Sequence, residues 1–150
     1  MADTIKGFSG EWEFLSNFAA CTIYYEDILY PSTEHAFQAA KSLDTAERQL
    51  IANAPTPGQA KKLGRTITLR ADWEDVKVGV MRDLLALKFS QGLARAVLFS
   101  TGDRLLVESN HWHDQIWGSC TCAQHRDIDG QNLLGTLLME LRTSLRARQG

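Results

Sequence analysis

The sequence has no long apolar run, few cysteines and almost no excess of charge of either sign. No stretch approaches the roughly 20 consecutive apolar residues that a membrane-spanning helix needs. The first residues lack a basic end followed by an apolar block, so no secretory signal is expected. Three cysteines, an odd number, do not indicate a disulfide framework. These absences predict a cytoplasmic protein that has no membrane partner.

The balance of residues is that of one ordinary globular domain. The chain has 150 residues, of which 44% are hydrophobic and 23% charged. It shows no internal repeat and no linker-like boundary, so we expect residues 1–150 to form a single domain. The formal net charge of −2 gives no electrostatic reason to expect a nucleic-acid or membrane-surface protein. A local basic pocket for a phosphate group remains compatible with it.

The order of the expected elements favours a helix-rich α+β fold with a few short strands. Aromatic and β-branched residues over 12–30, around a turn at Glu26-Asp27, predict a hairpin. Ser32 or Thr33 then caps a helix that runs to about Asp44. Further expected elements are helices over 45–54, 58–64 (ending in a left-handed cap at Gly64), 73–90, 93–100 and from about Asn132 onward, and a strand over 103–109. Strands and helices do not alternate regularly, which excludes a doubly wound sheet.

The stretch YPSTEHAFQAAKS, residues 30–42, concentrates polar side chains on a short helix. At about 100° per residue, Glu34, Gln38 and Lys41 share one narrow stripe, with Phe37 beside it. The opposite side is expected to face the core and carries Ala36, Ala40 and Leu43. Spacing alone favours a stripe that faces solvent. The alternative is a wall of an active site, in which the ring of Phe37 lies under a planar ligand.

A second cluster lies in the segment 108–125, ESNHWHDQIWGSCTCAQH, which is expected to be a loop. Irregular segments of this length in a small domain are usually functional or disordered, and two tryptophans argue against disorder. Trp112 and Trp117 flank Asp114, an arrangement that suits stacking on a base while charge develops on the sugar. The alternative is that both tryptophans only pin the loop to the core.

The same segment contains potential zinc ligands. They are His111, His113, Cys120, Cys122 and His125. The cysteines are separated by one residue, whereas zinc sites usually space them by two to four, and no second pair matches. The pattern therefore favours loop or core cysteines, and a small zinc-dependent interaction domain is a weaker interpretation.

Six motifs together resemble the NADAR family, over residues 7 to about 142. They are GEWEFLSNF, YPSTEHAFQAAK, MRDLLALKF, VLFSTGDRLLVES, HDQIWG and GQNLLGTLLMELR. The resemblance implies a compact, helix-rich α+β domain and an N-glycosidase that cleaves ribosyl–nitrogen bonds, with no metal and no cofactor. The implied substrates are phosphoribosylamino-pyrimidine intermediates of riboflavin biosynthesis, or ADP-ribosylated guanine, which would make a nucleic acid a partner. Residues 119–130 do not align with any pattern of the family.

Carried over by position, the resemblance implies that Glu34, Lys41 and Asp114 are catalytic. The residues expected to bind substrate are Asn17, His35, Gln38, Trp73, Lys88, Trp117, Gly118 and Asn132. Among these, Trp73 or Trp117 would stack on the base. Lys88 would meet a phosphate group, although a lysine late in a helix more often serves the helix C-terminus alone.

Two chemical routes fit these residues. A carboxylate can stabilise the positive charge that develops at the anomeric carbon, while a proton donor serves the leaving nitrogen. Glu34 and Asp114 are the candidates for this pair. Alternatively, a desolvated Lys41 attacks the anomeric carbon and forms a Schiff base, with Glu34 moving protons. The rival function is a module that binds ADP-ribose or a nucleotide without cleaving it.

Overall fold

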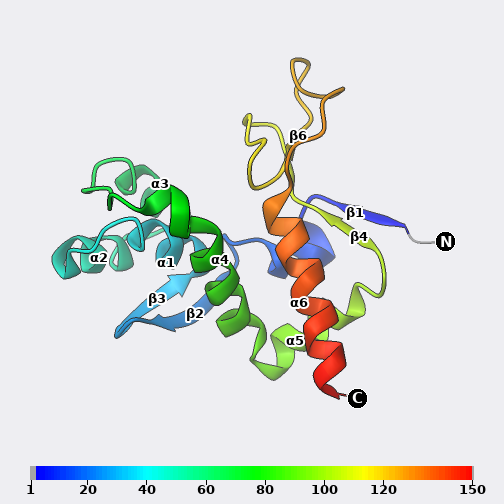
Figure 1. Ribbon diagram of the computed structural model, residues 1–150, viewed down its shortest axis with the longest axis horizontal. Coiled ribbons are helices and arrows are strands. Elements are labelled where there is room, and N and C mark those ends of the chain that lie inside the picture. The colour runs from blue at the N-terminus through cyan, green and yellow to red at the C-terminus, as the bar shows by residue number, and fades with distance from the viewer. Residues whose placement is uncertain (1–2, 150) are drawn as a thin grey trace. The chain divides into compact units, whose positions relative to one another are not determined.

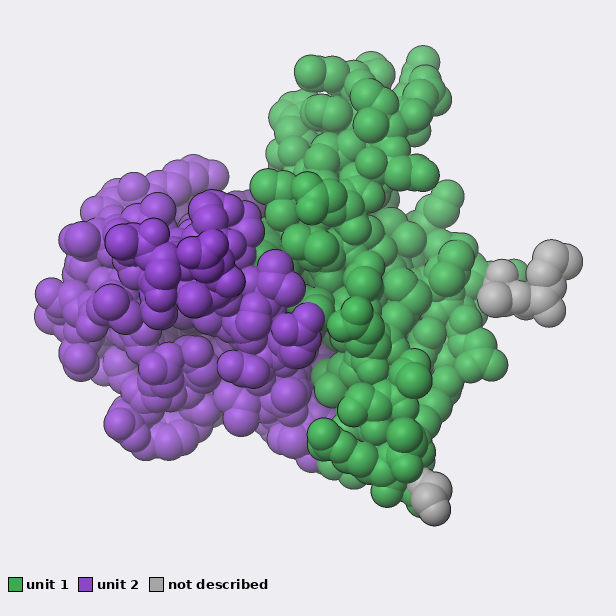
Figure 2. Space-filling view, in the orientation of Figure 1, with its two compact units in different colours: residues 1–16, 92–150 green, residues 17–91 purple. Residues whose placement is uncertain are grey.

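The structure, a computed structural model, describes residues 3–149. The chain forms two compact units: residues 17–91 make up one, and residues 1–16 with 92–150 make up the other (Figure 2). In chain order the elements are β1 (Thr4–Lys6), η1 (Gly10–Leu15), β2 (Ala20–Tyr25), β3 (Ile28–Ser32), α1 (Thr33–Ala39), α2 (Thr45–Ala52), α3 (Pro57–Leu63), α4 (Trp73–Phe89), α5 (Gly92–Ser100), β4 (Leu105–Val107), β5 (Ser109–Asn110), β6 (Ser119–Cys120) and α6 (Leu133–Gln149). Helices hold far more residues than the strands, which are short and pair two by two (Figure 1). The predicted helix-rich α+β class is confirmed.

The predicted hairpin is present in the 17–91 unit. Strands β2 and β3 pair antiparallel, and Glu26 and Asp27 take positive φ angles of 48° and 72° in the turn between them. Two left-handed residues in a two-residue turn match the twist of the flanking strands. Residues 12–15, predicted to belong to the hairpin, lie instead in the short 3-10 helix η1.

Helix α1 follows the hairpin directly and is shorter than predicted. Ser32 caps its N-terminus, since the Ser32 Oγ accepts a hydrogen bond from the backbone N–H of His35 at 3.1 Å. The helix ends at Ala39 rather than near Asp44, because Asp44 caps α2 by accepting hydrogen bonds from Ala46 and Glu47. The prediction that Leu43 lies in the core is wrong for the same reason: it falls between the helices and is 67% exposed.

Helix α3 ends at Gly64, but the predicted left-handed cap is wrong. Gly64 has the ordinary right-handed φ of −59°. A glycine is required there for space instead: a Cβ at this position would lie 2.0 Å from the Oε1 of Gln38. The end of α3 therefore packs against α1 closely enough to exclude any larger side chain.

In the other unit, β1 pairs with β4 in a parallel register that joins Thr4 to Leu105 and Lys6 to Val107 (Figure 1). Three residues carry too short a pattern to predict a strand, and β1 was not expected. The predicted strand over 103–109 is confirmed in its central part as β4. Helix α6 packs against β4 at Gly135, where a Cβ would lie 2.0 Å from the carbonyl oxygen of Leu106.

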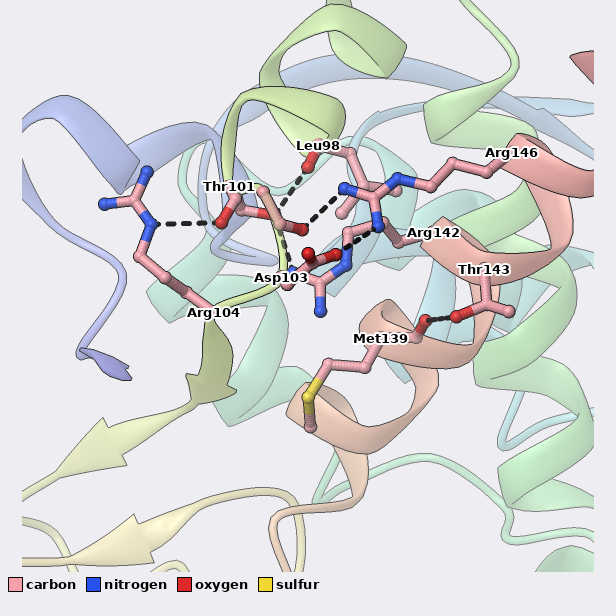
Figure 3. Close-up of polar contacts among 9 residues, drawn as sticks. Leu98, Thr101, Asp103, Arg104, Met139, Arg142, Thr143 and Arg146 are labelled. Atoms are coloured by element: carbon pink, nitrogen blue, oxygen red, sulfur yellow. Dashed lines mark hydrogen bonds and ion pairs between the residues drawn. The ribbon is translucent and has the colours of Figure 1, made fainter. Parts of the chain in front are cut away.

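Polar contacts hold α6 to the turn that follows α5 (Figure 3). Arg142 is buried and donates from Nη1 to the Oγ1 of Thr101 at 2.8 Å. Thr101 donates in turn to the carbonyl oxygen of Leu98. One turn further along α6, Arg146 binds both Asp103 and the carbonyl oxygen of Gly102. The hydrogen bonds of Arg142 and Arg146 thus fix α6 to the turn after α5, in addition to the packing of its buried leucines.

The helices within residues 3–149 do not reach the combination of length and apolar character needed to cross a membrane.

Candidate active site

Glu34 and Gln38 form a buried hydrogen-bonded pair on α1. Gln38 donates from its Nε2 to the Oε1 of Glu34 at 2.8 Å, and the two side chains are 7% and 5% exposed. Every residue of α1 is buried. The interpretation of this stripe as a solvent-facing surface is therefore wrong. A carboxylate is rarely buried unless it is paired or serves a function.

Asn17 lies beside this pair. Its carbonyl oxygen accepts a hydrogen bond from the backbone N–H of Glu34 at 3.0 Å, and its side-chain amide faces the sulfur of Met81. The Oδ1 of Asn17 and the Oε1 of Gln38 are buried, and neither has a hydrogen-bond partner among residues 3–149. Buried polar atoms are nearly always satisfied. The Oε1 of Gln38 packs against Gly64, whereas the unsatisfied Oδ1 of Asn17, on the residue that binds the backbone of Glu34, is a candidate acceptor for a ligand.

Lys41 lies just beyond α1 and is half-buried. Burial lowers the pKa of its ammonium below the ordinary value, the Glu34 carboxylate partly opposes this effect, and the nearby cations Arg65 and Lys61 lower the pKa further. A lysine in such surroundings holds more of the neutral, nucleophilic amine near pH 7 than an exposed lysine does. Lys41, Lys61 and Arg65 together also supply positive charge suited to a phosphate group.

Aromatic packing supports the helix that carries the pair. The rings of Phe37 and Trp73 lie 5.1 Å apart between centroids with a tilt of 54°. Trp73, the first residue of α4, is only 6% exposed. The structure thus uses the ring of Trp73 to pack α4 on α1, and stacking on a substrate base remains a prediction.

His35 and Lys88, both predicted to bind substrate, are deeply buried. Each ring nitrogen of His35 has a partner in the chain: Nδ1 lies 2.7 Å from the Oγ of Ser32, and Nε2 lies 3.0 Å from the carbonyl oxygen of Ala54. These contacts support a structural role for His35. Lys88 is 0% exposed, and burial lowers the pKa of its ammonium to about 8. Its Nζ lies 5.2 Å from the centre of the Phe89 ring.

In the other unit, the loop after β5 is built around Asn110 and Asp114. Asn110 donates to the carbonyl oxygen of Asp114 and accepts from the backbone N–H groups of Trp112 and Asp114. The Oδ1 of Asp114 accepts from the backbone N–H groups of Ile116 and Trp117, at 3.0 and 2.8 Å. The Asp-x-x-Trp motif is therefore a local turn in which the aspartate fixes the backbone that carries Trp117.

Gly118 and Asn132 both occupy positions that the backbone demands. A Cβ at Gly118 would lie 2.0 Å from the carbonyl oxygen of Glu108. Asn132 has a φ of 52°, and its side chain bridges two points near β4, accepting from the N–H of Glu108 and donating to the carbonyl oxygen of Leu106. Structural requirements account for both residues, and direct contact with substrate stays a prediction.

The same loop holds the one cluster of potential metal ligands found in the described part of the chain. Its members are His113, Cys120, Cys122 and His125. His111, the fifth candidate in the sequence, is not part of it, and its ring lies against Trp112.

Comparisons with known proteins agree with the motif pattern. The chain is 40% identical to N-glycosidase YbiA of Escherichia coli over 151 residues, covering 97% of this chain and 91% of that protein. It is 41% identical to an N-glycosidase of Nostoc punctiforme, covering 87% and 84%. It is 37% identical to a riboflavin biosynthesis protein of Vibrio vulnificus, covering 88% of this chain but 35% of that longer protein.

The fold agrees as well. The NMR structure of E. coli YbiA matches with a TM-score of 0.83 at 39% identity, over 99% of this chain and 89% of the other. The sequence model of the NADAR domain family matches residues 5–146, a range that extends over both units. This chain therefore belongs to the NADAR family.

Proposed function

We propose that this chain is an N-glycosidase that hydrolyses the ribosyl–nitrogen bond of a small-molecule substrate, a phosphoribosylamino-pyrimidine intermediate of riboflavin biosynthesis. The observation that carries the proposal is the burial of the Glu34 carboxylate near Lys41, whose pKa is lowered by burial and partly restored by the charge of Glu34. Relatives named as N-glycosidases and as riboflavin biosynthesis proteins support the reaction and the substrate class. Because one family model spans residues 5–146, we also propose that the two units belong to a single NADAR domain.

The surroundings of Lys41 favour the covalent route. The neutral amine attacks the anomeric carbon, and the bond to the base breaks as its nitrogen takes the electron pair and a proton. The sugar ring opens to a Schiff base, which water then hydrolyses to release the free sugar and restore the amine. The Glu34 carboxylate is placed to move these protons and to stabilise the positive charge at the anomeric carbon.

Binding of the rest of the substrate follows from the neighbouring groups. The unpaired Oδ1 of Asn17 suits a hydroxyl group of a ribose. Lys61 and Arg65 suit its 5′-phosphate. Asp114 holds the turn that carries Trp117, so we assign it a positioning role in place of the catalytic role implied by resemblance.

The test uses Glu34→Gln, Lys41→Arg and Lys41→Ala, with folding checked by circular dichroism. Each variant is expected to release base from a ribosylamino-pyrimidine phosphate about 10²–10⁴-fold more slowly than the wild type. Glu140→Gln and Lys62→Ala, at exposed positions, are the matched controls and should keep the full rate. Wild-type rates in folded Glu34→Gln and Lys41→Ala would refute the site.

Borohydride trapping separates the covalent route from simple acid–base catalysis. Reduction during turnover is expected to leave a sugar adduct on Lys41, detected by mass spectrometry and absent from Lys41→Arg. Wild-type turnover without any adduct would refute the Schiff base. Stable binding of the intact substrate without turnover would instead favour a non-catalytic binding module. ADP-ribosylated guanine, tested in the same assay, is the second predicted substrate class.

A further inference from the structure

Four side chains from the segment 113–125 converge on one point. His113 precedes the Asp114 turn, Cys120 ends β6, Cys122 follows two residues later, and His125 lies in the next turn. One ligand atom from each residue lies within 4.8 Å of all the others. Chain geometry, and not sequence adjacency, brings His113 to the two cysteines.

The spacing of the donor atoms is that of a tetrahedral metal site. The Nδ1 atoms of His113 and His125 are 3.4 Å apart. The Cys122 Sγ lies 3.4 Å from the Nδ1 of His113 and 3.1 Å from the Nδ1 of His125. A tetrahedral zinc ion, bound at about 2.3 Å to sulfur and about 2.0–2.1 Å to nitrogen, holds nitrogen ligands about 3.4 Å apart and sulfur–nitrogen pairs about 3.6 Å apart. The observed edges agree with these values to within about 0.5 Å.

Cys120 is the fourth potential ligand of the same ion. Cys120 is buried, and its Sγ accepts hydrogen bonds from the backbone N–H groups of His113 at 3.3 Å and of Cys122 at 3.4 Å. Such N–H donors stabilise a thiolate, the form of cysteine that binds metal. Its Sγ lies within 4.8 Å of the other three ligand atoms, and a tetrahedral zinc ion holds two sulfur ligands about 3.8 Å apart.

The backbone conformation of His113 also supports a ligand site at this cluster. Its φ of 72° is uncommon for a residue with a side chain. That conformation directs the imidazole toward Cys122 and His125, whose ring lies 5.3 Å away between centroids. Strain of this kind persists only where the surrounding structure or a ligand compensates for it.

We infer that His113, Cys120, Cys122 and His125 bind one zinc ion. Two thiolates and two neutral imidazoles neutralise its charge, and a set of two sulfurs and two nitrogens in tetrahedral order is typical of zinc. All four positions are filled by the protein, so the ion is structural and offers no open position for water or substrate. This inference revises the expectation of no metal, which rested on the short Cys-x-Cys spacing and on the family resemblance.

The zinc site lies in the loop that carries the family motif HDQIWG and would hold that loop in place. His113 and Cys120 bracket residues 114–119, which include Asp114 and Trp117, so the ion closes this turn at both ends. The ligands Cys120, Cys122 and His125 all lie within residues 119–130, where the sequence by itself showed no motif of the family. The ion is therefore a device of this chain for holding its loop, and it does not depend on the proposed reaction.

The test measures metal content by inductively coupled plasma mass spectrometry on the full chain, purified with reductant and without chelator. The wild type is expected to hold about one zinc ion per chain, and Cys122→Ser and His125→Asn about a tenth of that or less. Cys21→Ser and His111→Asn are matched controls, because Cys21 lies in the other unit and His111 lies outside the cluster, and they should keep the metal.

A second measurement uses the wild-type protein, so it tests the site even if a variant fails to fold. Wild-type protein stripped with chelator and loaded with cobalt(II) is expected to show thiolate charge-transfer bands and the strong visible bands of a tetrahedral ion. Zinc should also protect Cys120 and Cys122 from alkylation, and its removal should speed hydrogen exchange in residues 110–130 while leaving α1 unchanged. Reconstituted wild type with less than about a tenth of a zinc ion per chain would overturn the inference, as would a Cys120–Cys122 disulfide in the reduced preparation.

Discussion

Gln38 donates a hydrogen bond to Glu34 from one turn further along α1, and both side chains are withdrawn from solvent. The amide thereby orients the carboxylate, while its own Oε1 is left without a partner among residues 3–149. Gly64 packs against that same oxygen from the end of α3. The position of the carboxylate therefore depends on a glycine that lies 30 residues further along the chain.

Gly64→Ala should disturb this arrangement. The added Cβ would lie 2.0 Å from the Oε1 and 3.2 Å from the Cβ of Gln38, so the buried amide must move. We expect a loss of about 1–3 kcal/mol in the free energy of unfolding and a fall in kcat/KM of about tenfold or more.

Gly79→Ala is the matched control for this prediction. Gly79 lies within α4, and a Cβ there would meet no atom within 4 Å. The exchange should therefore raise the free energy of unfolding by about 0.5–1 kcal/mol and leave activity unchanged. Urea denaturation and initial rates measure both variants, and equal stability of the two would contradict the packing at Gly64.

The pH dependence of turnover should report the charges around Lys41. The reaction needs the neutral amine, so kcat/KM falls as the pH drops through the pKa of Lys41, which lies below the ordinary value. Removing a neighbouring cation in Arg65→Met raises that pKa, and the acid limb of the profile should move to higher pH by about 0.2–0.5 units at low salt.

Lys62→Met removes an exposed lysine of α3 that does not influence the pKa of Lys41 and should leave the limb in place. The shift should also shrink as salt is added, since Arg65 is exposed. A shift of equal size in both variants would show that net charge, and not the position of Arg65, is responsible.

Lys88 should make stability depend on pH in the alkaline range. Burial lowers its pKa to about 8 in the fold from the ordinary 10.5 of an exposed lysine, so between these limits the unfolded chain binds more protons than the folded one. The free energy of unfolding therefore rises with pH across this window, by about 3 kcal/mol for a group with no exposed surface.

Lys88→Met lacks this titration and isolates it. The stability of the wild type relative to Lys88→Met should increase from pH 7 to pH 10.5, measured by urea denaturation at each pH. A constant difference between the two proteins over this range would show that the ammonium is not buried as the fold requires.

Asn132 offers a test of the bridge to β4. Asn132→Gly removes two side-chain hydrogen bonds but tolerates the φ of 52°, and we expect a loss of about 1–3 kcal/mol. Asn132→Ala should cost about 1 kcal/mol more, because alanine resists a left-handed backbone. Thermal denaturation of the two variants gives the order, and a more stable alanine variant would contradict it.

Patterns that extend over one element were predictable from the sequence. The hairpin turn at Glu26-Asp27, the cap at Ser32 and helix α4 follow from residue preferences and from a repeat of apolar residues along a single helix or strand. The stripe of Glu34, Gln38 and Lys41 was also visible, because a helix places residues three and four apart on one side. The motifs identified the family for a similar reason, since each is a short run of contiguous residues.

Tertiary packing decided whether that stripe faces water or the interior, because α3 and α4 cover α1. The sequence of α1 alone does not show which other elements pack against it. The same holds for Gly64, whose constraint comes from Gln38, and for β1, whose three residues form a strand only beside β4. It holds most of all for the His113–His125 cluster. The sequence determined which side chains can bind a metal, while only the folded loop decided that four of them share one centre, because long-range approach depends on the path of the backbone between them.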